Sequence, residues 1–446
     1  MSSYYSRILE SLLIPAYYGL RSRSYSRRLD FMERSQWWSP ERVREFQWRE
    51  LRLLLKHVFC SVPYYQKKYA SAGIELGDIK TREDFAKLPP LSREEINSHR
   101  TELCSQRHLE LIPHATGGSS GVPTRFFITL DSYDWRCAAS ARAYSWSGYR
   151  TGERALYLWG APVGKVSRFK NAKLDAYRRL RRELIVPTFV QTPELWQSTF
   201  EEALRFRPRF VVGYVSSLQQ FAQFLMERQL SLTGVEAVLA AAEPVHNATR
   251  DLVAQAFGAP LFDTYGSREF MSIAAECGHH DGLHIHADNL LVETEKDSSN
   301  LASELLITDL HNYGMPFIRY RIGDLGSLSD SACACGRGLP LIRRIEGRIL
   351  EVLRTPDGRT IPGEFFPHLL KEIGEVREFQ VQQSSLEDIV LLVVLARPLT
   401  EGSEALLRQE VKKVFTPATR VTIKPVPAIP QLPSGKRRVS VGLPQN

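Results

Sequence analysis

Short apolar runs alternate with longer amphipathic segments from about residue 154 onward, and this alternation constrains the fold most strongly. The runs at residues 155–158, 210–213 and 237–241 carry no charge, and residues 217–228 between the last two have helical periodicity. Continuous apolar runs of this length are typical of strands that are buried on both faces of a sheet covered by helices. The sequence therefore predicts an α/β fold.

The segments before and after this region have different sequence patterns. Residues 40–110 predict amphipathic helices. Residues 349–360 predict a hairpin, and after it come an amphipathic helix, a strand at 389–396, a helix at 403–415 and a strand at 420–426. A chain of 446 residues is also long for one core. We predict a large N-terminal α/β domain, residues 1–346, and a small α+β C-terminal domain, residues 347–446.

Basic residues concentrate in two segments, residues 21–28 and 165–182, within a chain of formal net charge +8. Two interpretations stay open: a solvated helix face, or a surface that attracts the phosphates of a cofactor, an acidic acceptor or an anionic lipid. Neither segment has the interleaved aromatic residues that stack nucleic-acid bases, so no nucleic-acid partner is expected.

Residues 1–20 mix apolar side chains with Arg7 and Glu10, which predicts a helix that packs on the body or touches a membrane surface. No stretch of roughly eighteen uncharged apolar residues is present. Six cysteines are too few and too scattered for a disulfide framework, which indicates a reducing compartment. We expect a cytoplasmic protein. The alternative is a cytoplasmic protein that is peripheral to the inner membrane surface. The sequence does not indicate the oligomeric state.

A loop rich in glycine and hydroxyl residues spans residues 116–124 and precedes a predicted strand at 125–129. Its glycines allow backbone N–H groups to converge, which suits a polyphosphate; a surface turn is the alternative. No lysine follows the last glycine and no helix follows the loop, which excludes a P-loop. The candidate binding residues here are Thr116, Gly117, Gly118, Ser119, Ser120 and Gly121.

Three more short segments carry candidate chemistry. Tyr265 in the segment 263–269 could stack on a base, and Glu269 four residues later could bind Mg²⁺. Asp324 follows a predicted strand and turn, where a carboxylate can accept the hydroxyls of a ribose. Lys436 lies in a turn near the C-terminus. Each segment alone is a weak signal, but their order and spacing together are specific.

In this order, the four segments resemble the acyl-adenylate-forming superfamily, and within it the phenylacetate–CoA ligase-like branch that includes CapK-type proteins. The resemblance covers about residues 40–440. It implies a large adenylation domain and a small mobile C-terminal domain that carries the catalytic lysine. It also implies ATP-dependent, AMP-forming activation of a carboxylic acid with Mg²⁺, followed by acyl transfer, by default to coenzyme A. The partners are then a small carboxylic acid and an acyl acceptor.

The resemblance assigns roles residue by residue. It implies that Glu269 binds magnesium, that Tyr265 lies beside adenine, and that Lys436 contacts the carboxylate and the α-phosphate. Arg268 stands where the family usually has Thr or Ser beside the α-phosphate, and Leu350 stands where many members have an aspartate hinge. The remaining cofactor-binding candidates are Ala242, Glu243, Pro244, Asp263, Gly266, Asp324 and Arg348.

Alternatives to coenzyme A follow from the same resemblance, since CapK-like relatives are associated with surface polysaccharide production. The acceptor could be an amine, a sugar or a carrier protein, and the two departures at Arg268 and Leu350 also allow a nucleotide-binding pseudoenzyme. A non-enzymatic basic module would require the ordered motifs to be accidental. Candidate wall residues for the acid pocket indicate an apolar or aromatic acid: Tyr144, Trp146, Trp159, Tyr214 and Phe270.

Cys333 and Cys335 are one residue apart and precede Gly336, a spacing that allows two thiolates to share a metal in a tight knuckle. Cys277 lies upstream and is followed by several histidines. We predict a structural zinc site of Cys277, His284, Cys333 and Cys335, with His279 as the alternative histidine; free buried thiols are the competing interpretation. The resemblance supports zinc, because its branch often carries similar cysteines here.

Overall fold

The computed structural model forms two compact units. Unit 1 comprises Met1–His114, Arg125–Thr151 and Phe262–Gly347, and unit 2 comprises Ala115–Thr124, Gly152–Leu261 and Arg348–Asn446. The structure describes residues 3–107, 110–116, 124–160, 168–188, 191–243, 245–295, 303–329, 331–345, 353–357, 360–361, 365–370, 373–429 and 440–442.

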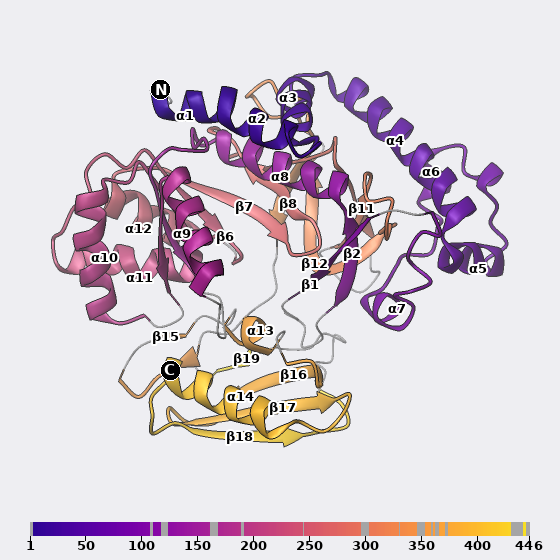
Figure 1. Ribbon diagram of the computed structural model, residues 1–446. Coiled ribbons are helices and arrows are strands. Elements are labelled where there is room, and N and C mark those ends of the chain that lie inside the picture. The colour runs from indigo at the N-terminus through magenta and orange to yellow at the C-terminus, as the bar shows by residue number, and fades with distance from the viewer. Residues whose placement is uncertain are drawn as a thin grey trace. The chain divides into compact units, whose positions relative to one another are not determined.

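Unit 2 contains a parallel sheet in the order β6-β5-β3-β4. Its strands are β3 (Ala155–Trp159), β4 (Glu183–Pro187), β5 (Phe210–Tyr214) and β6 (Ala237–Ala241), with the helices α9 (Arg168–Arg181), α10 (Pro193–Phe206), α11 (Val215–Glu227) and α12 (Asn247–Phe257). Every residue of β5 is buried, and Figure 1 shows α10, α11 and α12 gathered beside these strands. The α/β class predicted from the apolar runs is confirmed.

The C-terminal part of unit 2 forms a separate four-stranded sheet in the order β18-β17-β16-β19 (Figure 1). Its elements are the short pair β14 (Leu353–Arg354) and β15 (Thr360–Ile361), then α13 (Phe365–Leu370), β16 (Val376–Gln383), β17 (Asp388–Leu395), α14 (Glu401–Val414), β18 (Arg420–Pro425) and β19 (Ser440–Val441). One boundary between the units falls between Gly347 and Arg348. Whether residues 347–446 act as a domain of their own stays a prediction.

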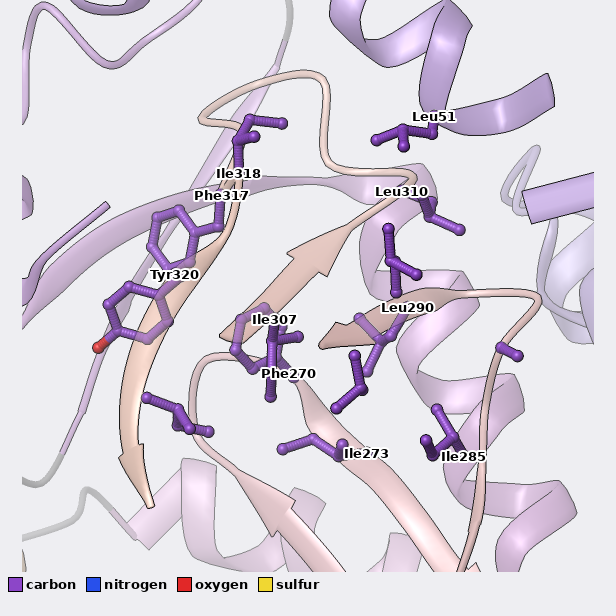
Figure 2. Packing of buried hydrophobic residues seen from close by; sticks show 14 of the residues in the cluster. Leu51, Phe270, Ile273, Ile285, Leu290, Ile307, Leu310, Phe317, Ile318 and Tyr320 are labelled. Atoms are coloured by element: carbon purple, nitrogen blue, oxygen red, sulfur yellow. The ribbon is translucent and has the colours of Figure 1, made fainter. Parts of the chain in front are cut away.

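Unit 1 is built on antiparallel strands in the order β7-β8-β9-β13-β12-β11-β10. These are β7 (Leu261–Ser267), β8 (Met271–Glu276), β9 (Leu283–Ile285), β10 (Leu290–Glu295), β11 (Ser303–Asp309), β12 (Tyr320–Ser329) and β13 (Leu341–Ile345). Figure 2 shows its core, where Phe270 packs with Ile273 and Ile307 from the strands. Leu51 reaches the same cluster from a helix.

The helices of unit 1 come mostly from the first 100 residues, as the periodicity predicts. They are α1 (Tyr4–Ile8), η1 (Leu9–Leu13), α2 (Ile14–Gly19), α3 (Tyr25–Ser35), α4 (Pro40–Ser61), α5 (Pro63–Ser71), η2 (Leu76–Asp78), α6 (Arg82–Phe85) and α7 (Arg93–Ser98). The pair β1 (Leu111–Ala115) and β2 (Arg125–Thr129) leads into α8 (Leu130–Ser145). None of the helices in the described ranges combines the length and the apolar character that a membrane crossing needs.

A buried ion pair joins α8 to the loop after β9 in unit 1. Arg142 is fully buried and donates to both carboxylate oxygens of Asp288, at 2.6 and 2.8 Å. Asp288 also accepts a hydrogen bond from the Ser35 hydroxyl at 2.6 Å. A buried charge is tolerated only while its partner is present, because desolvation of an unpaired ion is costly.

Asp288→Ala is therefore expected to lower the free energy of unfolding by about 3–5 kcal/mol, because Arg142 loses its counterion without regaining water. Urea denaturation followed by fluorescence measures this loss. Asp30→Ala is the matched control, since the pair of Asp30 with Arg34 is exposed on one helix; its removal is expected to cost roughly 0–1 kcal/mol. Equal losses in the two variants would contradict the structural role of the buried pair.

Candidate active site

The hairpin of β7 and β8 positions the segment 263–269 in unit 1. The register shifts between Tyr265 and Gly266, and the backbone of the opposite strand comes so close that a Cβ on Gly266 would lie 2.1 Å from the carbonyl oxygen of Met271. Met271 itself has φ of 61°, which is uncommon for a residue with a side chain. Only glycine fits at position 266, and the turn that results directs Glu269 into the interior.

Glu269 is only 3% exposed and holds two polar partners from distant parts of the chain. The Tyr320 hydroxyl donates to its Oε1 at 3.1 Å, and Arg93 Nη2 lies 3.4 Å from the same oxygen. Burial opposes the charge of Arg93, but Tyr320, Glu269 and Asp324 together raise its pKa. The Arg93 guanidinium therefore stays charged beside the Glu269 carboxylate, whose oxygens are the donor type that a hard cation such as Mg²⁺ prefers.

Arg93 is a site residue that the sequence analysis missed. It is the first residue of α7, where a positive charge faces the positive end of the helix dipole. That unfavourable placement is a weak signal that the side chain serves another purpose. Its partner Glu269 lies 176 positions away in the chain, so no local pattern links the two.

A second contact in unit 1 joins two predicted nucleotide residues. The Tyr265 hydroxyl donates to Asp324 Oδ2 at 2.8 Å. Asp324 follows Gly323, whose φ of 82° lies in the left-handed region that glycine adopts without strain. The hydrogen-bonded pair of Tyr265 and Asp324, and the hydrogen-bonded group of Arg93, Tyr320 and Glu269, are together called the carboxylate cluster.

The other described candidates behave differently. Arg268 is exposed beside the carboxylate cluster, and the backbone N–H of Asp263 donates to the Glu276 carboxylate at 2.8 Å. Several predicted residues lie outside the described part of the chain, so the structure places none of them: Gly117, Gly118, Ser119, Ser120, Gly121, Pro244, Arg348, Leu350 and Lys436.

Three of the candidate cofactor-binding residues lie in unit 2: Thr116, Ala242 and Glu243. Thr116 and Thr124 close the base of the glycine loop, because Thr116 N–H donates to the Thr124 carbonyl and Thr124 N–H donates to the Thr116 hydroxyl, each at 2.9 Å. Glu243 accepts from the N–H and the hydroxyl of Ser216, at 2.6 and 3.0 Å, and so caps α11. Burial raises the pKa of Glu243 despite these bonds. Ala242 has φ of 71°, a strained value that is frequent at functional sites.

The predicted metal ligands come together in unit 1. One ligand atom each from Cys277, His284, Cys333 and Cys335 lies within 4.8 Å of all the others. Cys277 follows β8, His284 lies on β9, and the two remaining cysteines precede β13. His279 is exposed and is not part of this group. The pairing of β9 with both β8 and β13 is what brings these segments together.

The geometry of this group fits a tetrahedral metal. The sulfurs of Cys277 and Cys333 are 3.7 Å apart, close to the ~3.8 Å that follows from two metal–sulfur bonds of about 2.3 Å in a tetrahedron. His284 Nε2 lies 3.3 Å from the Cys335 sulfur, and Arg337 N–H donates to that sulfur at 3.5 Å. Three thiols and one imidazole are the donor set that zinc prefers.

The candidate pocket residues split between two environments. In unit 1, Phe270 is fully buried in the core of Figure 2, and the Trp146 indole N–H donates to Gln36 at 2.8 Å. In unit 2, the rings of Trp159 and Tyr214 contact each other with centroids 4.5 Å apart and planes tilted by 34°. The contacts of these side chains are those of packed core residues, and they do not define a substrate.

Comparison with known proteins shows that the chain is similar to CapK and to phenylacetate-coenzyme A ligases. Residues 353–441 match the family model of the CapK C-terminal domain. The chain is 21% identical over 359 residues to Protein CapK of Staphylococcus aureus, covering 79% of each chain. It is 25% identical over 390 residues to the phenylacetate-coenzyme A ligase of Thermus thermophilus, covering 83% of this chain and 86% of that one. The corresponding ligase of Escherichia coli is 26% identical over 350 residues, 75% and 77% of the two chains.

Solved structures show the same fold. A 2-hydroxyisobutyryl-CoA ligase in complex with 2-HIB-AMP and CoA matches with a TM-score of 0.59 at 20% identity, over 92% of this chain and 91% of that one. The same enzyme in its postadenylation state matches with a TM-score of 0.57 at 20% identity over the same shares of the two chains. The chain therefore has the fold of the adenylate-forming ligases, carries a CapK C-terminal domain, and is related over most of its length to CapK and the phenylacetate–coenzyme A ligases.

Proposed function

We propose that this protein activates a carboxylic acid with ATP, forming an acyl-adenylate and pyrophosphate, and then transfers the acyl group to coenzyme A. The observation that carries the proposal is the carboxylate cluster, in which Arg93 and Tyr320 contact the candidate magnesium ligand Glu269 and Tyr265 contacts the candidate ribose ligand Asp324. Relatives named as acid–coenzyme A ligases over most of the chain support it.

Each described residue has a task in this reaction. Tyr265 offers a ring face to adenine while its hydroxyl orients Asp324, which accepts the ribose hydroxyls. Glu269 supplies a buried negative charge, and Arg93 and Tyr320 hold that carboxylate in place. Mg²⁺, when bound there, neutralises phosphate charge as the acid attacks. We assign the glycine loop 116–124 and Lys436 to the phosphates, and residues 347–446 to a mobile domain that brings Lys436 to the acid.

Tyr265→Phe is expected to weaken ATP binding by roughly 10–150-fold, because a hydrogen bond to a charged group such as Asp324 contributes about 1.5–3 kcal/mol. The phenylalanine keeps the ring, so Tyr265→Ala should bind more weakly still. Titration calorimetry with Mg-ATP measures both. Tyr313→Phe, also in unit 1 but outside the carboxylate cluster, is the control; if it lost as much affinity as Tyr265→Phe, the hydroxyl of Tyr265 would have no specific role.

The acceptor defines the second candidate function. The match of residues 353–441 to the CapK domain favours a relative of CapK over a catabolic ligase, and an amine, a sugar or a carrier-protein thiol would then replace coenzyme A. Incubation with ATP, the activated acid and each acceptor, followed by mass spectrometry, separates the two. An acyl-coenzyme A product supports the first proposal. An acylated amine, sugar or carrier with no thioester of coenzyme A supports the second. A protein that binds ATP but forms no AMP with any acid or acceptor is a pseudoenzyme.

We also propose that zinc occupies the site of Cys277, His284, Cys333 and Cys335 and has a structural role. Burial raises the pKa of the Cys277 thiol to about 12, and burial lowers the pKa of His284 to about 4. The histidine is therefore neutral, which is its metal-binding form, and a bound cation would stabilise the thiolates.

We also assign the protein to the cytoplasm, because the proposed substrates, ATP and coenzyme A, are those of a cytoplasmic enzyme.

A further inference from the structure

The N-terminal helical stretch, from α1 through η1 to α2, leaves several large apolar side chains exposed although others pack on unit 1. Its large apolar residues are exposed by 80% at Tyr4, 63% at Leu12, 50% at Tyr17 and 89% at Leu20. Ile8 and Leu13 on the same stretch are also exposed. An ordinary surface helix has mainly polar side chains on its exposed side, so this second, exposed apolar set is unusual. We call these six side chains the outer face.

The inner side of this stretch is anchored to unit 1 by polar contacts as well as by packing. The Ser6 hydroxyl donates to the Thr151 carbonyl at 2.9 Å, and Glu10 accepts from the Thr151 N–H at 2.9 Å. Leu9 is 1% exposed, and Tyr18 stacks on Tyr25 with ring centroids 4.6 Å apart. These contacts fix the inner side of the stretch on unit 1 and leave the outer face exposed; the ribbon of the stretch is indigo in Figure 1, after the N label.

Positive charge predominates in the N-terminal segment that carries the outer face. The first 29 residues hold five arginines, and Glu10 is their only acidic residue. Glu10 is turned inward toward Arg150 and Thr151. Residues 1–29 therefore place no carboxylate on the same side as the outer face. Arg7, Arg21 and Arg27 are exposed, and the Arg21 guanidinium lies 4.6 Å from the centre of the Tyr17 ring.

We propose that the outer face binds an anionic lipid surface, with the helical stretch lying in the plane of the membrane. Exposed leucines and tyrosines with flanking arginines are the composition of interfacial amphipathic helices. The apolar side chains would enter the boundary between headgroups and acyl chains, and the arginines would meet lipid phosphates, each contributing electrostatic attraction that falls off within a Debye length. This contact is independent of the proposed ligase activity.

Sedimentation of the full-length protein with lipid vesicles tests the proposal. We expect binding to phosphatidylglycerol–phosphatidylcholine vesicles and much weaker binding to pure phosphatidylcholine. Leu12→Ser/Leu20→Ser is expected to lower the partition coefficient about tenfold or more, because two exposed leucines lose their apolar burial. The control Leu53→Ser/Leu204→Ser changes leucines of 51% and 47% exposure on α4 and α10 and is expected to bind like the wild type.

Three results would overturn the proposal. One is a wild-type protein that does not bind anionic vesicles in preference to neutral ones, and a second is an equal loss in the control variant. The third is a wild-type dimer that Leu12→Ser/Leu20→Ser converts to a monomer with vesicle binding unchanged, since a second copy of the chain would then cover the outer face. Analytical ultracentrifugation of the same samples detects the dimer.

Discussion

Replacing Glu269 with glutamine is expected to lower the rate of adenylate formation by about 10²–10³-fold, the loss that follows removal of one group stabilising transition-state charge. Glutamine keeps the shape of the side chain and its contact with the Tyr320 hydroxyl, but it removes the charge that a magnesium ion needs. The measurement is exchange of labelled pyrophosphate into ATP in the presence of the acid substrate. Raised magnesium should restore part of the rate, since a weakened site is filled at higher concentration.

Two variants separate this effect from a loss of folding. Glu293→Gln changes another carboxylate of unit 1 that pairs with an arginine, Arg319, at 3.3 Å, and it is expected to keep its exchange rate. The double variant Arg93→Gln/Glu269→Gln removes both buried charges, so its stability should return toward that of the wild type. Its exchange rate should stay low. If exchange recovered together with stability, Glu269 would have a purely structural role.

Cys333→Ser is expected to have the largest effect on stability. The purified wild-type protein should contain about one zinc ion per chain, and the variant should contain little. Loss of several kcal/mol from a net stability of roughly 5–15 kcal/mol should lower the melting temperature by about 10 °C or more. Metal analysis and differential scanning fluorimetry measure the two effects, and a chelator should reproduce the thermal shift in the wild type.

The matched control for the zinc site is Cys60→Ser, because Cys60 is exposed and lies outside the metal group. It should keep both the zinc and the melting temperature. Free thiols at Cys277 and Cys333 are the competing interpretation; in that case the purified protein contains no metal. An added oxidant would then join these two sulfurs in a disulfide, and replacing either cysteine would change stability only under oxidising conditions.

The parallel strands of unit 2 were predictable because burial on both faces leaves a local mark, an uncharged run such as residues 210–213. The antiparallel sheet of unit 1 leaves no such mark. Its strand β13 pairs with β9 through Leu341 and His284, which are far apart in the chain, and periodicity does not encode such pairings. The later strand β19 went unpredicted for the same reason, since its pairing with β16 is parallel and non-local. The strand β16 was also missed, although it pairs with its neighbour β17.

The candidate active site shows the same difference between local patterns, which the sequence reveals, and non-local contacts, which it does not. Motifs that occupy consecutive residues, such as the segment 263–269, were found from order and spacing. His284, and not His279, lies with the three cysteines because β9 pairs with β8 and brings His284 to them; its role as a metal ligand stays a prediction. Arg93 could not be found, since only the folded unit brings α7 beside Glu269.

Pyrophosphate exchange across a panel of aryl, fatty and amino acids tests the central claim most directly, because it detects adenylate formation before any acceptor is involved. The wild type is expected to catalyse exchange with one acid or a narrow class of acids, while Glu269→Gln falls by about 10²–10³-fold and Lys436→Ala falls at least as far while still binding ATP. Absence of exchange with every acid, in protein that binds Mg-ATP tightly, would contradict adenylation and identify a nucleotide-binding protein without this activity.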